Sequence, residues 1–196
     1  MKKKLREFYD KERKVSDEYY DICESYNGRN AKIVKLRLKK IIKTDPNFLD
    51  AYLFLSDILQ DEGKVKEAEK LTDEAYRRAI SLITDKEGNW PDVIEWAWLD
   101  NRHIVKAIYN KAVSLWHKKK TDESLNILRK LLRTNPNDNI GARNMILGIR
   151  MGMSYTEFET RFNKGGFYDA ELFDWFDDNY KKFPDEFDWW DKATEE

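Results

Sequence analysis

The stretch PNFLDAYLFLSDILQDEGKVKEAEKLTDEAYRRAI, residues 46–80, decides the fold of this chain. Pro46 precedes a run of apolar residues at helical spacing, and Gly63 interrupts that pattern after about four turns. A second amphipathic pattern follows and continues to Ile80. Two helices joined by a short break predict an antiparallel helical hairpin.

The hairpin carries defined residue types at fixed spacing. Tyr52, Leu55-Ser56 and Leu59 occupy successive turns of the first helix, and Ala68 and Ala75 follow Ser56 by twelve and nineteen residues. This pattern resembles the tetratricopeptide repeat (TPR) family. The resemblance implies an all-α, TPR-like right-handed superhelix of antiparallel helical hairpins, in which small residues let paired helices approach closely. It also implies that the first helix of each hairpin lines a concave groove.

Two weaker copies of the pattern flank this hairpin. On the N-terminal side, Tyr19, Ile22-Cys23 and Tyr26 occupy the aromatic, Leu-Gly and Tyr positions, with Cys23 as the small residue. The second helix of that pair is expected to end at Asp45, because the residue before a proline is disfavoured in a helix. On the C-terminal side, Ala112 and Ser124 are again twelve residues apart. We therefore expect about three hairpins.

The repeat period breaks between the second and third hairpins. Pro46 and Pro136 are 90 residues apart, whereas two repeats of 34 residues take 68, so 22 residues are extra. We place the extra residues in a second helix prolonged past Ile80 and in the segment that follows it. Pro91 is expected to begin a new helix there. Apolar residues near the N-terminus predict a further short helical stripe: Leu5, Phe8 and Tyr9.

The C-terminal part changes character after a well-marked helix. Ser154 and Glu157 form a capping-box pattern at its start, and Gly165-Gly166 ends it. From Phe167 the chain is both acidic and aromatic. We divide the chain into a TPR-like helical repeat domain, residues 1–166, and an acidic aromatic C-terminal helix and tail, residues 167–196. Because disordered segments are poor in aromatic residues, we expect this tail to dock on the repeats as a capping helix.

Composition excludes several classes of protein. The net charge is −1, although residues 1–43, 44–100, 101–150 and 151–196 carry net charges of +7, −8, +8 and −8. The single cysteine, Cys23, cannot form an internal disulfide and suits a reducing compartment. The N-terminal lysines are not followed by an apolar run, and no stretch approaches the roughly 20 apolar residues of a membrane span. We therefore expect a cytoplasmic protein that does not bind membranes.

Motifs that carry chemistry are missing from the sequence. It contains neither a Gly-rich phosphate loop nor a Gly-x-Ser-x-Gly elbow. His103 and His117 are fourteen residues apart on one predicted helix, about 21 Å, so they cannot share a metal ion. We expect no enzyme activity, no cofactor and no metal. Nucleic-acid binding is disfavoured because acidic blocks of equal size alternate with the basic ones.

The predicted groove supplies the candidate binding residues. One hairpin contributes Leu53, Asp57 and Gln60, and the next contributes Lys106, Tyr109, Val113, Trp116 and His117. Two interpretations of Trp116 remain open, a peptide anchor beside Tyr109 or a core residue packed between hairpins. Arg102 and Arg143 are expected to pair locally at helix starts, and the alternative is a joint anion site.

The sequence thus predicts a non-catalytic scaffold that binds a protein or peptide in the concave groove. The alternative is a self-assembling structural subunit, a homo-oligomer formed through the tail or a terminal hairpin. The residues do not identify the protein partner.

Overall fold

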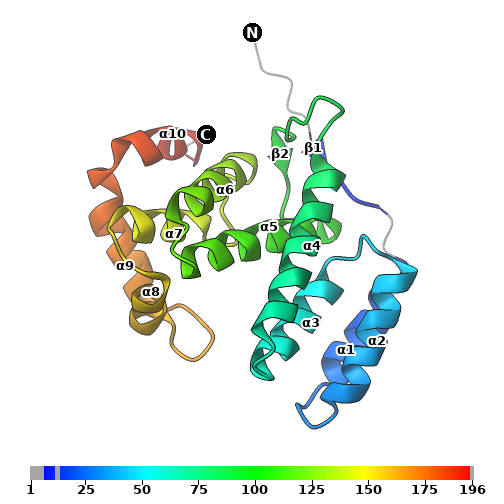
Figure 1. Ribbon diagram of the computed structural model, residues 1–196. Coiled ribbons are helices and arrows are strands. Elements are labelled where there is room, and N and C mark those ends of the chain that lie inside the picture. Colours follow the sequence, from blue (N-terminus) through cyan, green and yellow to red (C-terminus); the bar gives the residue numbers. More distant parts are fainter. Residues whose placement is uncertain (1–6, 12–13, 195–196) are drawn as a thin grey trace. The chain divides into compact units, whose positions relative to one another are not determined.

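The computed structural model describes residues 7–11 and 14–194, and helices make up most of this part of the chain (Figure 1). The all-α prediction is confirmed. In chain order the elements are β1 (Glu7–Phe8), α1 (Ser16–Ser25), α2 (Ala31–Thr44), α3 (Asp50–Asp61), α4 (Val65–Ile83), β2 (Val93–Ile94), α5 (Leu99–His117), α6 (Thr121–Thr134), α7 (Ala142–Arg150), α8 (Tyr155–Phe162), α9 (Ala170–Asn179), the 3-10 turn η1 (Tyr180–Lys182) and α10 (Pro184–Thr194).

The chain forms two compact units, which divide within α5 between Lys111 and Ala112. The first unit contains the hairpins α1–α2 and α3–α4, together with the N-terminal part of α5. The second contains the C-terminal end of α5 and everything that follows, so the acidic aromatic tail belongs to it. The compositional boundary at residues 166/167 therefore lies inside the second unit.

Small residues hold the α3–α4 hairpin together, as the repeat pattern predicts. Ser56 is 2% exposed, and its hydroxyl donates a hydrogen bond of 3.0 Å to the carbonyl oxygen of Ala68. Ala68 and Ala75 are completely buried. In the α5–α6 pair the serine lies on the second helix instead of the first, and the Ser124 hydroxyl donates to the carbonyl oxygen of Ala112 at 2.8 Å. In both pairs one serine joins residues twelve positions apart.

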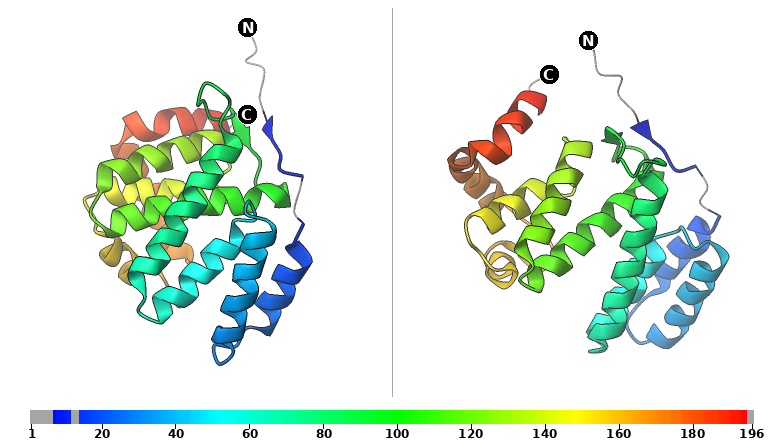
Figure 2. Two further views of the ribbon diagram at one scale, coloured as in Figure 1. Left: turned by 45° about the vertical axis from the view of Figure 1, so that its right-hand side comes forward. Right: turned by 45° about the horizontal axis from the view of Figure 1, so that its top comes forward.

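The α1–α2 hairpin follows the same plan, but its register differs by one residue from the sequence prediction. Cys23, expected at the small contact position, is exposed, and Ile22 is buried there instead. Ile22 precedes the buried Val34 by twelve residues and Ser56 by 34, the period of the repeat. A one-residue shift turns a helical side chain by about 100°, so Cys23 faces away from the hairpin contact. Figures 1 and 2 show α1 and α2 side by side.

The extra residues after α4 correct two predictions. Pro91 does not begin a helix: it precedes β2, which pairs in parallel with β1, so Phe8 is extended rather than helical. Asn101 stabilises this pair because its side-chain amide donates to the carbonyl oxygens of Phe8 (2.7 Å) and Glu95 (3.2 Å). Long-range pairing of this kind overrides local helical spacing. Leu5 lies outside the described residues.

Aromatic packing organises the second unit. Trp116 is 2% exposed, its indole N–H donates to the carbonyl oxygen of Met153 at 3.1 Å, and its ring contacts Phe158 on α8. Gly148 on α7 lies against both rings, so that a Cβ atom there would come within 2.8 Å of Phe158 and 2.9 Å of Trp116. The predicted capping box at the start of α8, Ser154 with Glu157, is present with both hydrogen bonds.

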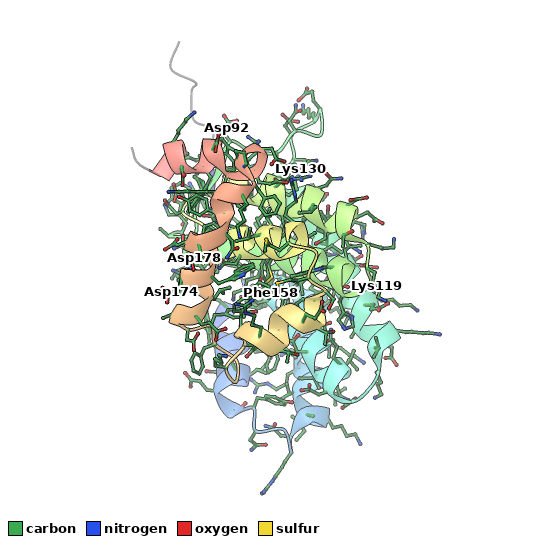
Figure 3. All side chains as sticks on the ribbon, turned by 90° about the vertical axis from the view of Figure 1, so that its left-hand side faces the viewer. Asp92, Lys119, Lys130, Phe158, Asp174 and Asp178 are labelled. Atoms are coloured by element: carbon green, nitrogen blue, oxygen red, sulfur yellow. The ribbon has the colours of Figure 1, made fainter. Side chains whose placement is uncertain are left out.

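The last two helices are attached by buried aromatics and ion pairs. Phe187 is 1% exposed, and the Trp190 indole N–H donates to the carbonyl oxygen of Pro136 at 2.8 Å. Glu186, itself buried, forms ion pairs with Arg129 on α6 and Arg150 on α7. Hydrogen bonds from these two guanidinium groups outweigh the effect of burial and hold the pKa of Glu186 below its ordinary value. Figure 3 shows this end of the chain, with Asp174 and Asp178 on α9.

Candidate functional site

A groove of about 290 Å³ opens on the first unit where α1, α3 and α5 meet. These are the first helices of their hairpins, the elements expected to line a concave surface. Its walls are formed by Tyr19, Cys23, Asp50, Leu53, Phe54, Asp57, Lys106 and Asn110.

One side of the groove is apolar and aromatic. Leu53 is 6% exposed, and Phe54 lies beside it on α3, half-buried. The Tyr19 ring meets the Phe54 ring edge-on at a centroid distance of 6.3 Å, and Tyr26 contacts the same ring at 5.1 Å. Burial raises the pKa of Tyr19 above its ordinary value, so its phenol is neutral at physiological pH. Rigid rings of this kind provide contact area at low entropic cost.

The other side of the groove is charged. Lys106 on α5 forms an ion pair of 3.3 Å with Asp50 on α3, and Asp50 is 7% exposed. Asp57 lies two turns further along α3, and no described residue forms an ion pair or hydrogen bond with its carboxylate. Asp57 is exposed, but the neighbouring protein removes part of the water around its carboxylate and Asp61 repels it, which together raise the pKa of Asp57 to about 6. Within the described part of the chain, the groove thus holds one carboxylate that has no cationic partner.

The structure brings together three of the ten predicted binding residues: Leu53, Asp57 and Lys106. Gln60 is exposed and Tyr109 is half-buried, but neither lines the groove. Arg102 lies over the ring of Trp96 at 5.2 Å and donates to its carbonyl oxygen, so this guanidinium group has local partners.

The remaining predicted residues belong to the second unit. Trp116 is buried, which matches the core interpretation and contradicts the anchor interpretation, because a side chain that is 2% exposed has no surface left for a peptide. His117 is exposed beside Tyr155, and Val113 is half-buried. Arg143 pairs with Asp138 at 3.5 Å and lies over the ring of Trp190 at 5.1 Å. Arg102 and Arg143 are therefore each paired locally, as first expected, and a joint anion site gains no support.

The sequence pattern did not predict five of the residues that line the groove, and aligning the repeats at equivalent positions identifies them. With Ser56 and Ala112 as equivalent positions, Asp50 and Lys106 both lie six residues before them, and Phe54 and Asn110 both lie two residues before them. With Ile22 as the equivalent position in α1, Tyr19 and Cys23 correspond to Leu53 and Asp57. The predicted register of α1 was wrong by one residue, so it did not assign Tyr19 and Cys23 to the groove.

Cys23 is exposed at the edge of the groove. Partial burial raises the pKa of its thiol, although the phenol of Tyr19 acts in the opposite direction. Among the described residues, no group of three His, Cys, Asp or Glu side chains is placed to hold a metal ion. Every helix in the described ranges is too short or too polar to cross a bilayer.

Successive antiparallel hairpins joined at small residues, with a groove on their first helices, define an all-α helical repeat protein. The Tetratricopeptide repeat family model matches residues 105–138, which span the C-terminal part of α5 and all of α6. This segment is therefore similar to a tetratricopeptide repeat, in line with the TPR-like helical hairpins of the described residues, and repeats of this kind serve in general as protein–protein interaction scaffolds. Comparisons with curated proteins and with solved structures give no significant match.

Proposed function

We propose that this protein is a non-catalytic scaffold that binds an extended peptide segment of another protein in the groove of α1, α3 and α5. The observation that carries this proposal is the open groove itself, which combines an apolar side at Leu53 with the carboxylate of Asp57, for which the described residues supply no ion-pair partner. The absence of catalytic motifs from the sequence supports a binding role over an enzymatic one.

The lining of the groove favours a particular kind of peptide. An apolar side chain fits against the apolar side of the groove, which Leu53 and the rings of Tyr19 and Phe54 form together. A lysine or arginine next to it in the peptide would meet Asp57, because Lys106 already neutralises Asp50. A charge-assisted hydrogen bond to a carboxylate is stronger than a neutral one and adds direction to the contact. The ligand is therefore an apolar residue beside a basic one.

A peptide array tests this proposal with a matched pair of variants. The array contains apolar–basic, apolar–acidic and apolar–neutral peptides, and bound protein is detected through a fluorophore attached away from the groove. We expect apolar–basic peptides to be retained, and we expect Asp57→Asn to weaken their binding at least tenfold. Asp61→Asn removes a carboxylate from the same helix outside the groove lining and should have little effect when the array is run at about pH 8, where Asp57 is ionised with or without the repulsion from Asp61. Equal loss in both variants, or no preference for basic peptides, contradicts the proposal.

The groove also predicts a pH dependence of binding. Asp57 must be ionised to pair with a cation, and its pKa of about 6 means that it takes up a proton as the pH falls through that value. Affinity for a basic peptide should therefore decrease below about pH 6 and be constant above pH 7, and Asp57→Asn should remove this dependence. Titrations by isothermal calorimetry at several pH values measure it. A pH-independent wild-type affinity would exclude Asp57 from the contact.

A further inference from the structure

The outer face of the α1–α2 hairpin exposes large apolar side chains. The hairpin packs on the rest of its unit through buried residues that include Ile22, Val34 and Leu38. On the opposite side, Ile33 and Leu36 of α2 are 62% and 64% exposed. Large apolar side chains that are exposed together and surrounded by charged residues mark an interaction surface.

The two helices of this hairpin carry opposite charges. α2 contains six basic residues and no acidic one: Lys32, Lys35, Arg37, Lys39, Lys40 and Lys43. α1 contains four acidic residues and no basic one: Asp17, Glu18, Asp21 and Glu24. Most of these charges are exposed, and Glu18 and Lys40 form the one ion pair between the two helices in the described part of the chain, at 3.4 Å.

Charged and apolar residues form one stripe on each helix. The basic stripe of α2 consists of Lys32, Ile33, Leu36, Lys39 and Lys43, and the acidic stripe of α1 consists of Asp17, Tyr20, Asp21 and Glu24. Residues three, four and seven positions apart share a helix face, so each stripe is continuous. Tyr20 is 48% exposed and gives the acidic stripe an apolar element of its own. The two stripes therefore carry opposite charges, and each has an exposed apolar side chain that the other can cover.

We propose that this outer face is a self-association surface, on which the basic stripe of one copy packs against the acidic stripe of a second copy. A twofold axis satisfies both stripes at once, because a twofold interface uses the same surface on each copy and pairs residue i with j and j with i. Ile33 and Leu36 would then be covered by the second copy beside its Tyr20. This surface is formed by the outward sides of the hairpin and is separate from the peptide groove.

The size of the surface predicts weak association. Helices of 10 and 14 residues are about 15 and 21 Å long and about 10 Å wide, which gives a footprint of roughly 300–400 Å² per copy, about half of the roughly 800 Å² per partner in a stable interface. We expect a dissociation constant in the micromolar range that increases with salt, since exposed charges are screened. Sedimentation velocity over a dilution series from about 5 to 500 μM covers this range.

A charge swap tests the pairing directly. Asp21→Lys with Glu24→Lys makes both stripes basic, and Lys32→Glu with Lys39→Glu reverses most of the basic stripe. Each variant should dissociate at least tenfold more readily than the wild type. An equimolar mixture of the two should associate again, because each reversed stripe finds a complementary one on the other variant. Ile33→Ser with Leu36→Ser, which changes exposed residues alone, should also weaken association and serves if a charge variant fails to fold.

The control is a similar face on α9, where Asp174 and Asp178 are exposed (Figure 3). Phe173, which precedes Asp174 in the same helix, is 49% exposed. Asp174→Lys with Asp178→Lys should leave the association unchanged. Association lost in this variant and retained in the α1 variant would replace the proposal with head-to-tail assembly. A wild-type chain that stays monomeric at all concentrations, or charge variants that do not re-associate on mixing, would overturn it. Peptide binding is measured separately, so its failure does not affect this result.

Discussion

Trp116→Ala provides the sharpest test of the second unit. The side chain is 2% exposed, its ring packs on Phe158 and against Gly148, and its N–H group bonds to the carbonyl oxygen of Met153. Replacing a buried tryptophan with alanine costs about 3–5 kcal/mol, because apolar contacts are lost and a cavity remains. We therefore expect the free energy of unfolding to fall by that amount in equilibrium urea denaturation.

Two companion variants divide this cost into its parts. Trp116→Phe keeps most of the ring and leaves the Met153 carbonyl oxygen without its partner, for an expected loss of about 1–3 kcal/mol. His117→Ala changes the exposed neighbour and should stay within about 0.5 kcal/mol of the wild type. If Trp116→Ala costs less than about 1 kcal/mol, the packing described for this residue is wrong. Loss of peptide binding with unchanged stability would restore the anchor interpretation.

Three further predictions use the same denaturation assay. Ser56→Leu should cost about 1–3 kcal/mol by overpacking the α3–α4 contact, and an unchanged midpoint would disprove the repeat register. Gly148→Ala should be destabilising despite the higher helix propensity of alanine, because the added methyl group would collide with Phe158 and Trp116. The loss of stability should be smaller in a Phe158→Leu background, where space is available, and identical losses in both backgrounds would contradict the close contact. Glu186, whose pKa is lowered in the folded state, contributes stability that is complete above its unfolded pKa of about 4.5 and is lost as the pH falls through the lower folded value. Glu186→Gln should therefore flatten the acid side of the stability profile, and a parallel profile would argue against its ion pairs with Arg129 and Arg150.

Local patterns in the sequence were sufficient for most helices. The Ser154–Glu157 capping box, the glycine after α3 and the proline after α2 mark helix ends through backbone geometry that depends on adjacent residues alone. The twelve-residue spacing between Ser56 and Ala68 also reports a contact directly, because a hairpin with a short turn has only one way to bring these positions together. These features can therefore be recognised from the sequence without knowledge of the tertiary structure.

The contacts between distant segments required the tertiary structure. Val93 and Ile94 become a strand because they pair with residues more than eighty positions earlier, and no local spacing records that pairing. The choice between Ile22 and Cys23 as the buried residue of α1 depends on which face α2 and α3 cover, since both residues suit a helix equally well in isolation.

The candidate site also has features that the sequence predicts and features that only the tertiary structure decides. The sequence by itself determined that the first helices of the hairpins would form a groove, and it placed Leu53, Asp57 and Lys106 in it. Only the tertiary structure decided that Trp116 lies in the core, that Asp50 takes Lys106 as its partner and that Asp57 keeps none among the described residues. The physical reason is that helical periodicity fixes the direction of a side chain, whereas its burial and its charge partner depend on residues that arrive from elsewhere in the chain.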